Sequence, residues 1–180
     1  QYANETWTQL GSDIDGEAAS DYSGDSVSLS GDGSIVAIGA SRNDGNGTDS
    51  GHTRIYQYAN ETWNQLGSDI NGEAEGDYSG TALSLSDDGT IVAIGASWNN
   101  ENGTRSGHTR IYQYANETWT QLGSDIDGKS AFDYSGDEVS LSGDGSIVAI
   151  GSYMSNDPGY YSGHASIYRY SSESWNQLGS

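Results

Sequence analysis

Hydrophobic and polar residues alternate along short stretches of this chain in a way that predicts β-strands. In "SVSLS" from Ser26, apolar Val27 and Leu29 alternate with serines, which is the pattern of a strand with one buried face. Asp32-Gly33 follows as a tight-hairpin signal. "IVAIGA" from Ile35 is apolar on both faces, as a strand covered on both sides should be. These residues predict two antiparallel strands, of which the second lies in the interior.

Two further strands complete the pattern. A loop rich in Gly, Asn and Asp spans residues 41–51 and leads into "HTRIYQY" from His52. Asn60-Glu61-Thr62 then turns the chain into "WNQLG" from Trp63. The resulting antiparallel sheet has small residues on its first two strands and large aromatic residues on its last two. Such a sheet is wedge-shaped, and wedges pack side by side in a β-propeller.

The whole pattern repeats with a fixed period and without insertions or deletions. Tryptophan and histidine each recur every 56 residues, as Trp7, Trp63, Trp119 and Trp175 and as His52, His108 and His164. A fixed period of this size is the signature of stacked or circular repeats. One sheet alone would leave two apolar faces in water, so each copy needs neighbours.

The predicted fold is therefore all-β, with four-stranded antiparallel blades of β-propeller type. Three 56-residue repeats would belong to a larger propeller or to an open array of blades. The predicted boundaries are 1–24 for the last strand of a preceding blade and its connection, 25–80 and 81–136 for two blades with their connections, and 137–180 for the third blade.

The repeated motifs resemble a known family. "YSGDSVSLSGDGSIVAIGAS" and its two copies, followed by "GHTRIY" or "GHASIY", resemble the FG-GAP repeats of integrin-alpha-like propellers. Tyr22-Ser23-Gly24 stands where the Phe-Gly element would be, and Ile38-Gly39-Ala40 stands where Gly-Ala-Pro would be. The resemblance implies a propeller that binds calcium. "IYQYANETWTQL" is also similar to the strand-turn-strand of tectonin-type propellers, which implies a sugar-binding protein.

Charge excludes some partners. The chain has 26 acidic and 6 basic residues, for a formal net charge of −20, so it should repel nucleic acid and anionic lipid surfaces. It has no cysteine, which excludes disulfides, thiolate metal sites and a cysteine nucleophile. Its apolar runs are far too short to span a bilayer.

Five Asn-X-Ser/Thr sequons predict an extracellular protein that carries N-linked glycans. They begin at Asn4, Asn46, Asn60, Asn102 and Asn116, in loops or turns between predicted strands. The alternative is that these asparagines only serve the turns.

Calcium is the cofactor that the FG-GAP resemblance implies. Asp13, Asp15, Glu17 and Asp21 have a 1, 3, 5, 9 spacing that suits a loop around a hard cation. The glycine of this loop, however, stands at its fourth position rather than its sixth, and Lys129 replaces the third ligand in the last unit. The sequence therefore predicts no cofactor and no metal, with calcium on these four residues as the alternative.

A catalytic Ser/His/Asp arrangement is a single set of side chains, whereas the histidine at His52, His108 and His164 recurs in every unit. The sequence therefore predicts that the chain is not an enzyme, and that the histidine makes hydrogen bonds within or between blades.

Differences between the copies predict a contact surface. The long loop varies at Arg42, Trp98 and Met154, which correspond, and at Asp49, Arg105 and Tyr161. Exposed aromatic rings and arginines are typical of contact surfaces, so the predicted contact residues are Arg42, Trp98, Arg105, Tyr153, Tyr160 and Tyr161. The alternative is that each ring folds back on its own loop.

These features together predict a non-enzymatic, extracellular, N-glycosylated repeat protein with a structural or adhesive role. "ETWTQLGS" from Glu5 returns as "ESWNQLGS" from Glu173, so we expect further copies of the chain or of the repeat as partners, in a filament or in a larger closed propeller. The alternative function is a lectin-like or integrin-like module that binds a carbohydrate or a protein through the variable loops.

Overall fold

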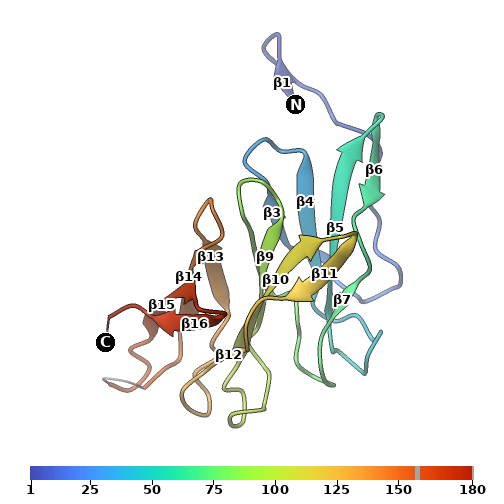
Figure 1. The fold of residues 1–180 in the computed structure, drawn as a ribbon. Coiled ribbons are helices and arrows are strands. Elements are labelled where there is room, and N and C mark those ends of the chain that lie inside the picture. The colour runs from blue at the N-terminus through green and yellow to red at the C-terminus, as the bar shows by residue number, and fades with distance from the viewer. Residues whose placement is uncertain (157–158, 180) are drawn as a thin grey trace.

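The structure is a computed structural model that describes residues 1–156 and 159–179, and within these residues every regular element is a β-strand (Figure 1). The first sheet comprises β3 (Ser23–Leu29), β4 (Ile35–Ala40), β5 (His52–Ala59) and β6 (Thr62–Gln65). The second comprises β8 (Ala82–Leu85), β9 (Ile91–Ala96), β10 (His108–Ala115) and β11 (Thr118–Gln121). The third comprises β13 (Glu138–Leu141), β14 (Ile147–Ser152), β15 (His164–Ser171) and β16 (Ser174–Gln177). The predicted antiparallel blades are confirmed.

Shorter strands extend this plan. β7 (Ile70–Asn71) pairs with the start of β5, and β12 (Ile126–Asp127) pairs with the start of β10. At the N-terminus, β1 (Tyr2–Ala3) and β2 (Thr6–Trp7) form a hairpin that extends away from the three blades (Figure 1). Blade 1, blade 2 and blade 3 denote the sheets that begin with β3, β8 and β13.

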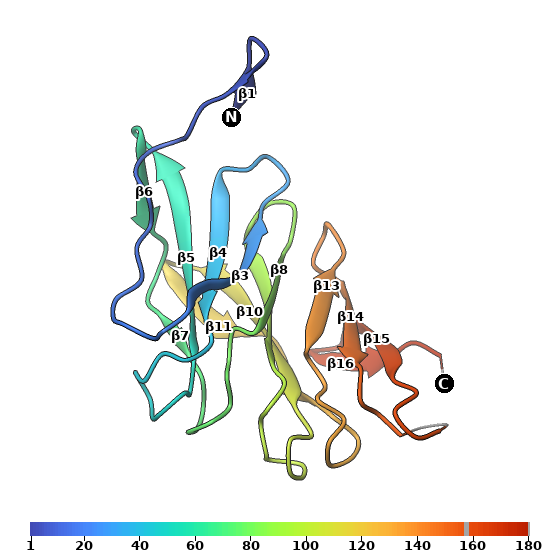
Figure 2. The same ribbon diagram turned by 180° about the vertical axis from the view of Figure 1, so that it is seen from behind.

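The blades pack through their first strands. β3 lies against β8 and β8 against β13, whereas β6, β11 and β16 lie at the outer edges (Figure 2). One core lies between blades 1 and 2 and contains Ile35, Ile55, Leu85, Val92 and Ile94. A second core lies between blades 2 and 3 and contains Ile111, Ile126, Val139, Val148 and Ile150. The "IVAIGA" strands are therefore interior, as predicted.

The two outer faces of this array remain open. Val27 and Leu29 of blade 1 are 64% and 60% exposed, although Leu85, the counterpart of Leu29 in blade 2, is only 7% exposed. At the other end, Ile167 of blade 3 is 43% exposed, whereas its counterpart Ile111 is fully buried. Each open face has the apolar composition of a blade interface.

The hairpin turns follow their sequence signals. Asp32 accepts hydrogen bonds from the backbone N–H of Ser34 at 2.9 Å and from the Ser30 hydroxyl at 2.9 Å. The same set of hydrogen bonds in blade 3 lowers the pKa of Asp144 to about 2. Between β5 and β6, Asn60 and Glu61 both have positive φ, 52° and 65°, which is the geometry of a tight two-residue hairpin turn.

The next-to-last residue of each interior strand is a glycine, and in β4 and β9 this glycine lets adjacent blades approach closely. A Cβ on Gly39 would lie 2.1 Å from the carbonyl oxygen of Gly80, and a Cβ on Gly95 would lie 1.9 Å from that of Gly136. The Gly80 carbonyl also accepts a hydrogen bond from Ser26 Oγ across the interface, at 2.6 Å. Gly151 is the counterpart in blade 3, and the nearest atom to its Cβ would be 3.4 Å away.

Gly95→Ala should therefore destabilise the protein, because the new methyl group would push blade 3 away from blade 2. We expect a loss of about 1–3 kcal/mol in the free energy of unfolding, measured by urea denaturation followed by circular dichroism. Gly151→Ala is the matched control and should change it by less than about 0.5 kcal/mol. Equal losses in the two variants would contradict this account of the interface.

A tryptophan on each outer strand links its blade to the connection from the previous one. Trp63, Trp119 and Trp175 are half-buried, and their indole N–H groups donate to the carbonyl oxygens of Leu10, Leu66 and Leu122 at 2.9, 2.7 and 2.7 Å. Trp7 is the copy in the N-terminal hairpin and is 82% exposed.

Trp119→Ala should lower the free energy of unfolding by about 2–4 kcal/mol, since it removes half-buried apolar area and leaves the Leu66 carbonyl without its donor. Trp7→Ala should have little effect on the main unfolding transition. Thermal unfolding of both variants checks this, and a Trp7→Ala variant as unstable as Trp119→Ala would refute it.

Candidate functional site

Aromatic rings and one guanidinium group form a continuous row across the three blades. This aromatic row consists of Tyr22, Arg42, Tyr78, Trp98, Tyr134 and Tyr153. The Arg42 guanidinium lies 4.7 Å from the Tyr22 ring centre and 5.7 Å from that of Tyr78. From there, successive ring centres are 5.0 Å apart for Tyr78 and Trp98, 6.0 Å for Trp98 and Tyr134, and 5.6 Å for Tyr134 and Tyr153.

Three tyrosines of the row occupy one repeated position with an unusual backbone. Tyr22, Tyr78 and Tyr134 precede the Ser-Gly of each repeat and have φ values of 58°, 54° and 52°. A positive φ is costly for a bulky residue and is characteristic of functional sites. Tyr22 has this conformation although no atom lies near a Cβ on Gly24, two residues later. In all three repeats the tyrosine carbonyl accepts a hydrogen bond from the backbone N–H three residues later, so the conformation belongs to the local turn.

The variable loops fix the two inner tyrosines. The Tyr78 hydroxyl donates to Asp49 at 3.2 Å, and the Tyr134 hydroxyl accepts from Arg105 at 3.1 Å. Asp49 and Arg105 occupy the same repeat position, so the polar partner changes from acceptor to donor between copies. Arg105 also stacks on Trp98, with its guanidinium 4.1 Å from the ring centre.

The aromatic row is open to solvent along most of its length. Tyr22 is 55% exposed, Trp98 36% and Tyr153 51%. A groove between blades 1 and 2 is lined by Tyr22, Arg42, Tyr78 and Trp98, with Asp25 and Thr81 as further polar groups. The arrangement offers flat apolar faces beside hydrogen-bonding groups, which suits a ligand with both kinds of surface.

The structure brings Arg42, Trp98, Arg105 and Tyr153 together in or beside this row, out of the six predicted contact residues. Trp98 and Tyr153 pack on tyrosines outside their own loops. Tyr160 and Tyr161 instead stack on each other, with ring centres 4.0 Å apart. Sequence analysis missed Tyr22, Tyr78 and Tyr134, because it took contact residues from positions that differ between the copies. Of these three tyrosines, Tyr22 is exposed, Tyr78 is half-buried and Tyr134 is buried.

Carboxylates gather around the repeated histidine at two blade junctions. In blade 1, His52 is 4% exposed, and its Nδ1 lies 3.9 Å from Glu17 and 4.0 Å from Asp69. Arg54 binds Asp69 through two hydrogen bonds, at 2.9 and 2.8 Å, and pairs with Glu17 at 2.5 Å. Arg54 therefore compensates both acids, and its hydrogen bonds lower the pKa of Asp69.

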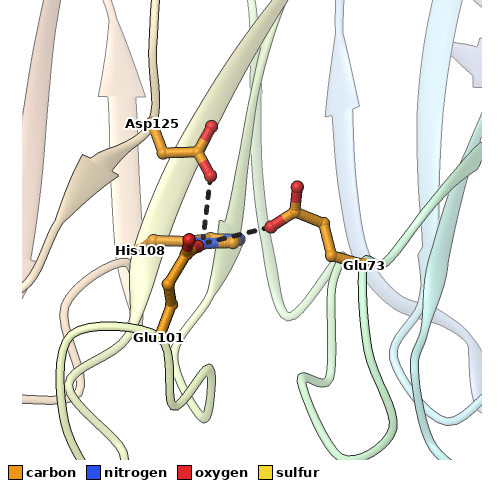
Figure 3. A group of neighbouring side chains, drawn as sticks. All are labelled: Glu73, Glu101, His108 and Asp125. Carbon is orange, nitrogen blue, oxygen red and sulfur yellow. Dashed lines mark ion pairs between the residues drawn. The ribbon is translucent and has the colours of Figure 1, made fainter.

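The corresponding group at blade 2 is more acidic. Glu73, Glu101 and Asp125 surround His108, which is 1% exposed (Figure 3). Burial lowers the pKa of His108 to about 4, and the charge of Arg110 acts in the same direction. Burial is also the main cause of the raised pKa of Glu73, to which the charges of Asp125 and Glu101 add. The Nδ1 atoms of His108 and His164 have no hydrogen-bond partner among the described residues, so the predicted histidine hydrogen bonds are absent at these atoms.

The four residues of the predicted calcium loop lie in different environments. Glu17 belongs to the His52 group, Asp13 accepts a hydrogen bond from Gln9, and Asp21 is buried and accepts one from Asn43. Asp15 is exposed. Within residues 1–156 and 159–179, these four do not form a group of converging ligands.

The five sequon asparagines fall into two structural sets. Asn4, Asn60 and Asn116 are exposed and occupy the first position of the two-residue hairpin turns, with φ near 50°. In contrast, the side-chain Nδ2 of Asn46 donates to the Gly72 carbonyl at 2.8 Å, and that of Asn102 donates to the Gly128 carbonyl at 2.7 Å.

Comparison with known proteins places this arrangement among β-propeller folds. The chain is similar to Sqt1 of Saccharomyces cerevisiae, with a TM-score of 0.56, 12% identity, and coverage of 89% of this chain and 36% of that one. It is also similar to a putative 6-phosphogluconolactonase of Bacteroides uniformis, with a TM-score of 0.55, 14% identity, and coverage of 85% and 38%. The chain thus spans little more than a third of the length of these proteins. At such identities the likeness establishes the propeller-type fold.

Within that fold, residues 13–56 match the family model of the FG-GAP repeat, which confirms the resemblance that the repeated motifs indicate. No curated protein sequence matches the chain. No helix among the described residues is long and apolar enough to cross a membrane.

One prediction from the sequence requires correction. The repeated histidine led to the prediction that the chain is not an enzyme. The proteins that share its fold include putative 6-phosphogluconolactonases of Bacteroides uniformis and Bacteroides fragilis. Repeated blades are therefore compatible with catalysis, and the prediction was wrong to exclude it.

Proposed function

We propose that this chain is an extracellular, N-glycosylated propeller module with an adhesive role, and that it binds neutral glycans through the aromatic row. The observation that carries the proposal is the row itself, because it runs without a break across three blades and remains exposed on Tyr22, Trp98 and Tyr153.

The chemistry of the row suits a sugar. The ring faces offer flat apolar contact area at low conformational cost, and Arg42, Asp25 and Thr81 supply donors and acceptors for hydroxyl groups. The net charge of −20 disfavours anionic polysaccharides. The match of residues 13–56 to the FG-GAP repeat supports an adhesive role, since the family resemblance is to integrin-alpha-like propellers.

Further blades of the same repeat are the proposed partners of the open faces. Leu85 of blade 2 donates its backbone N–H to Ser28 Oγ of blade 1, and Leu141 of blade 3 donates to Ser84 Oγ of blade 2, both at 2.9 Å. Ser140 is the next serine in this series. It would accept from the next blade, in a larger propeller or a filament.

Glycan binding should depend on the aromatic row. We expect Trp98→Ala and Tyr153→Ala each to weaken capture on an array of neutral glycans by about tenfold or more, because each removes an exposed stacking surface worth about 1–3 kcal/mol. Trp7→Ala removes an indole that is more exposed than either side chain and lies outside the row, and it should leave capture unchanged. Capture of a protein ligand alone, or equal losses in all three variants, would contradict the proposal.

Glycan occupancy should differ between the two sets of sequons. Asn4, Asn60 and Asn116 present free side chains on exposed turns, whereas glycosylation of Asn46 or Asn102 would break the hydrogen bond of the same nitrogen that carries the glycan. Glycopeptide mass spectrometry of the chain secreted from eukaryotic cells should show high occupancy at the first set and low occupancy at the second. The reverse order would refute this interpretation of the turns.

A further inference from the structure

Three carboxylates converge on one imidazole nitrogen at the junction of blades 1 and 2 (Figure 3). Glu73 lies in the connection after β7, Glu101 lies in the loop between β9 and β10, His108 begins β10, and Asp125 immediately precedes β12. One ligand atom from each of the four side chains lies within 4.8 Å of all the others. We call these residues the Glu73 cluster.

The imidazole nitrogen that faces the carboxylates has no protein partner. His108 Nδ1 is buried and makes no hydrogen bond, although an unsatisfied buried polar atom is costly. Its separations from Asp125 Oδ2 and Glu73 Oε2 are 3.6 and 3.9 Å, which are too long for hydrogen bonds. They are close to the roughly 3.4 Å between ligands of a tetrahedral ion with bonds of about 2.0–2.2 Å.

The nearby guanidinium leaves the centre of the cluster free. Arg110 pairs with Glu73 Oε1 at 3.1 Å and donates to the carbonyl of Asn71 at 2.9 Å. The other oxygen of Glu73, Oε2, is the one nearest His108. Arg110 therefore orients Glu73 from outside the cluster, as an outer-shell partner orients a metal ligand. The three carboxylates of the cluster outnumber this one arginine, so negative charge remains for a cation to neutralise.

The other copies of this site lack one or more of its features. In blade 1, Gly45 occupies the position of Glu101, and Arg54 takes both oxygens of Asp69. In blade 3, Lys129 occupies the position of Glu73. The cluster at His108 therefore combines Glu101 as a fourth potential ligand with an oxygen of Asp125, Oδ2, that faces His108 rather than an arginine.

We propose that Glu73, Glu101, His108 and Asp125 bind one Zn²⁺ ion, which links the connection after blade 1 to blade 2. A nitrogen with three carboxylate oxygens matches the ligands and four-coordinate geometry that Zn²⁺ accepts. Ca²⁺ prefers six to eight oxygens, and Mg²⁺ is rarely held by a cage made only of protein ligands. This site is independent of glycan binding by the aromatic row and differs from the predicted calcium loop.

Titration of the whole 180-residue chain with ZnCl₂ by isothermal calorimetry, at physiological ionic strength, tests the proposal. We expect one Zn²⁺ per chain, a rise in melting temperature that EDTA reverses, and zinc X-ray absorption that shows one nitrogen among oxygen ligands. Glu101→Gln should weaken Zn²⁺ binding by at least about tenfold. Because Glu101 is exposed, this variant should retain the wild-type circular dichroism spectrum.

Glu75→Gln is the matched control. It makes the same charge change two residues from Glu73, on an exposed side chain outside the cluster, and should leave Zn²⁺ affinity unchanged. Absence of stoichiometric binding would overturn the proposal. Equal weakening by Glu75→Gln, or equal affinity for Ca²⁺, would also overturn it, because either result would mean that cations bind nonspecifically to the acidic surface.

Discussion

The burial of each interior strand between two neighbouring sheets is the interaction on which the rest of the structure depends. Val92 and Ile94 of β9 are almost inaccessible to water, and full burial of one such side chain contributes about 1.5–3 kcal/mol. No single blade can achieve this burial, because each face of its sheet needs a partner. The chain therefore gains stability from blade to blade, as stacked repeats do, and its terminal faces remain apolar.

Blade packing also sets the spacing of the candidate binding surface. The Gly80 carbonyl lies so near Gly39 that no side chain fits between them. Tyr78, two residues earlier, has a φ of 54° and is half-buried. The same contact recurs at Gly95 and Gly136, and Tyr134 has a similar φ of 52° one blade further, where its side chain is buried. The spacing of the tyrosines in the aromatic row is thus a consequence of blade packing. The variable loops supply the side chains between them, Arg42 and Trp98.

The sequence was sufficient to predict the blades, their order along the chain and the interior position of β4, β9 and β14. These features follow from the alternation of apolar and polar residues, from the Asp-Gly turns and from the fixed period of 56 residues. It was not sufficient to predict the Glu73 cluster, because Glu101 and Asp125 come from separate loops and meet only when β10 and β12 pair. The 1, 3, 5, 9 spacing pointed instead to a loop whose Glu17 in fact lies with His52 and Arg54.

Divergence between nearly identical copies is the most direct indication of where function resides. The packing positions hardly change, so a substitution outside them alters one junction and leaves the blades intact. Glu101 in place of Gly45 adds a carboxylate beside a buried imidazole, and Trp98 in place of Arg42 replaces a guanidinium with an aromatic face. Both changes occur in the loop between the second and third strands. That loop adjoins the aromatic row on one side and the histidine junction on the other, so a single variable segment supplies both candidate sites without disturbing the core.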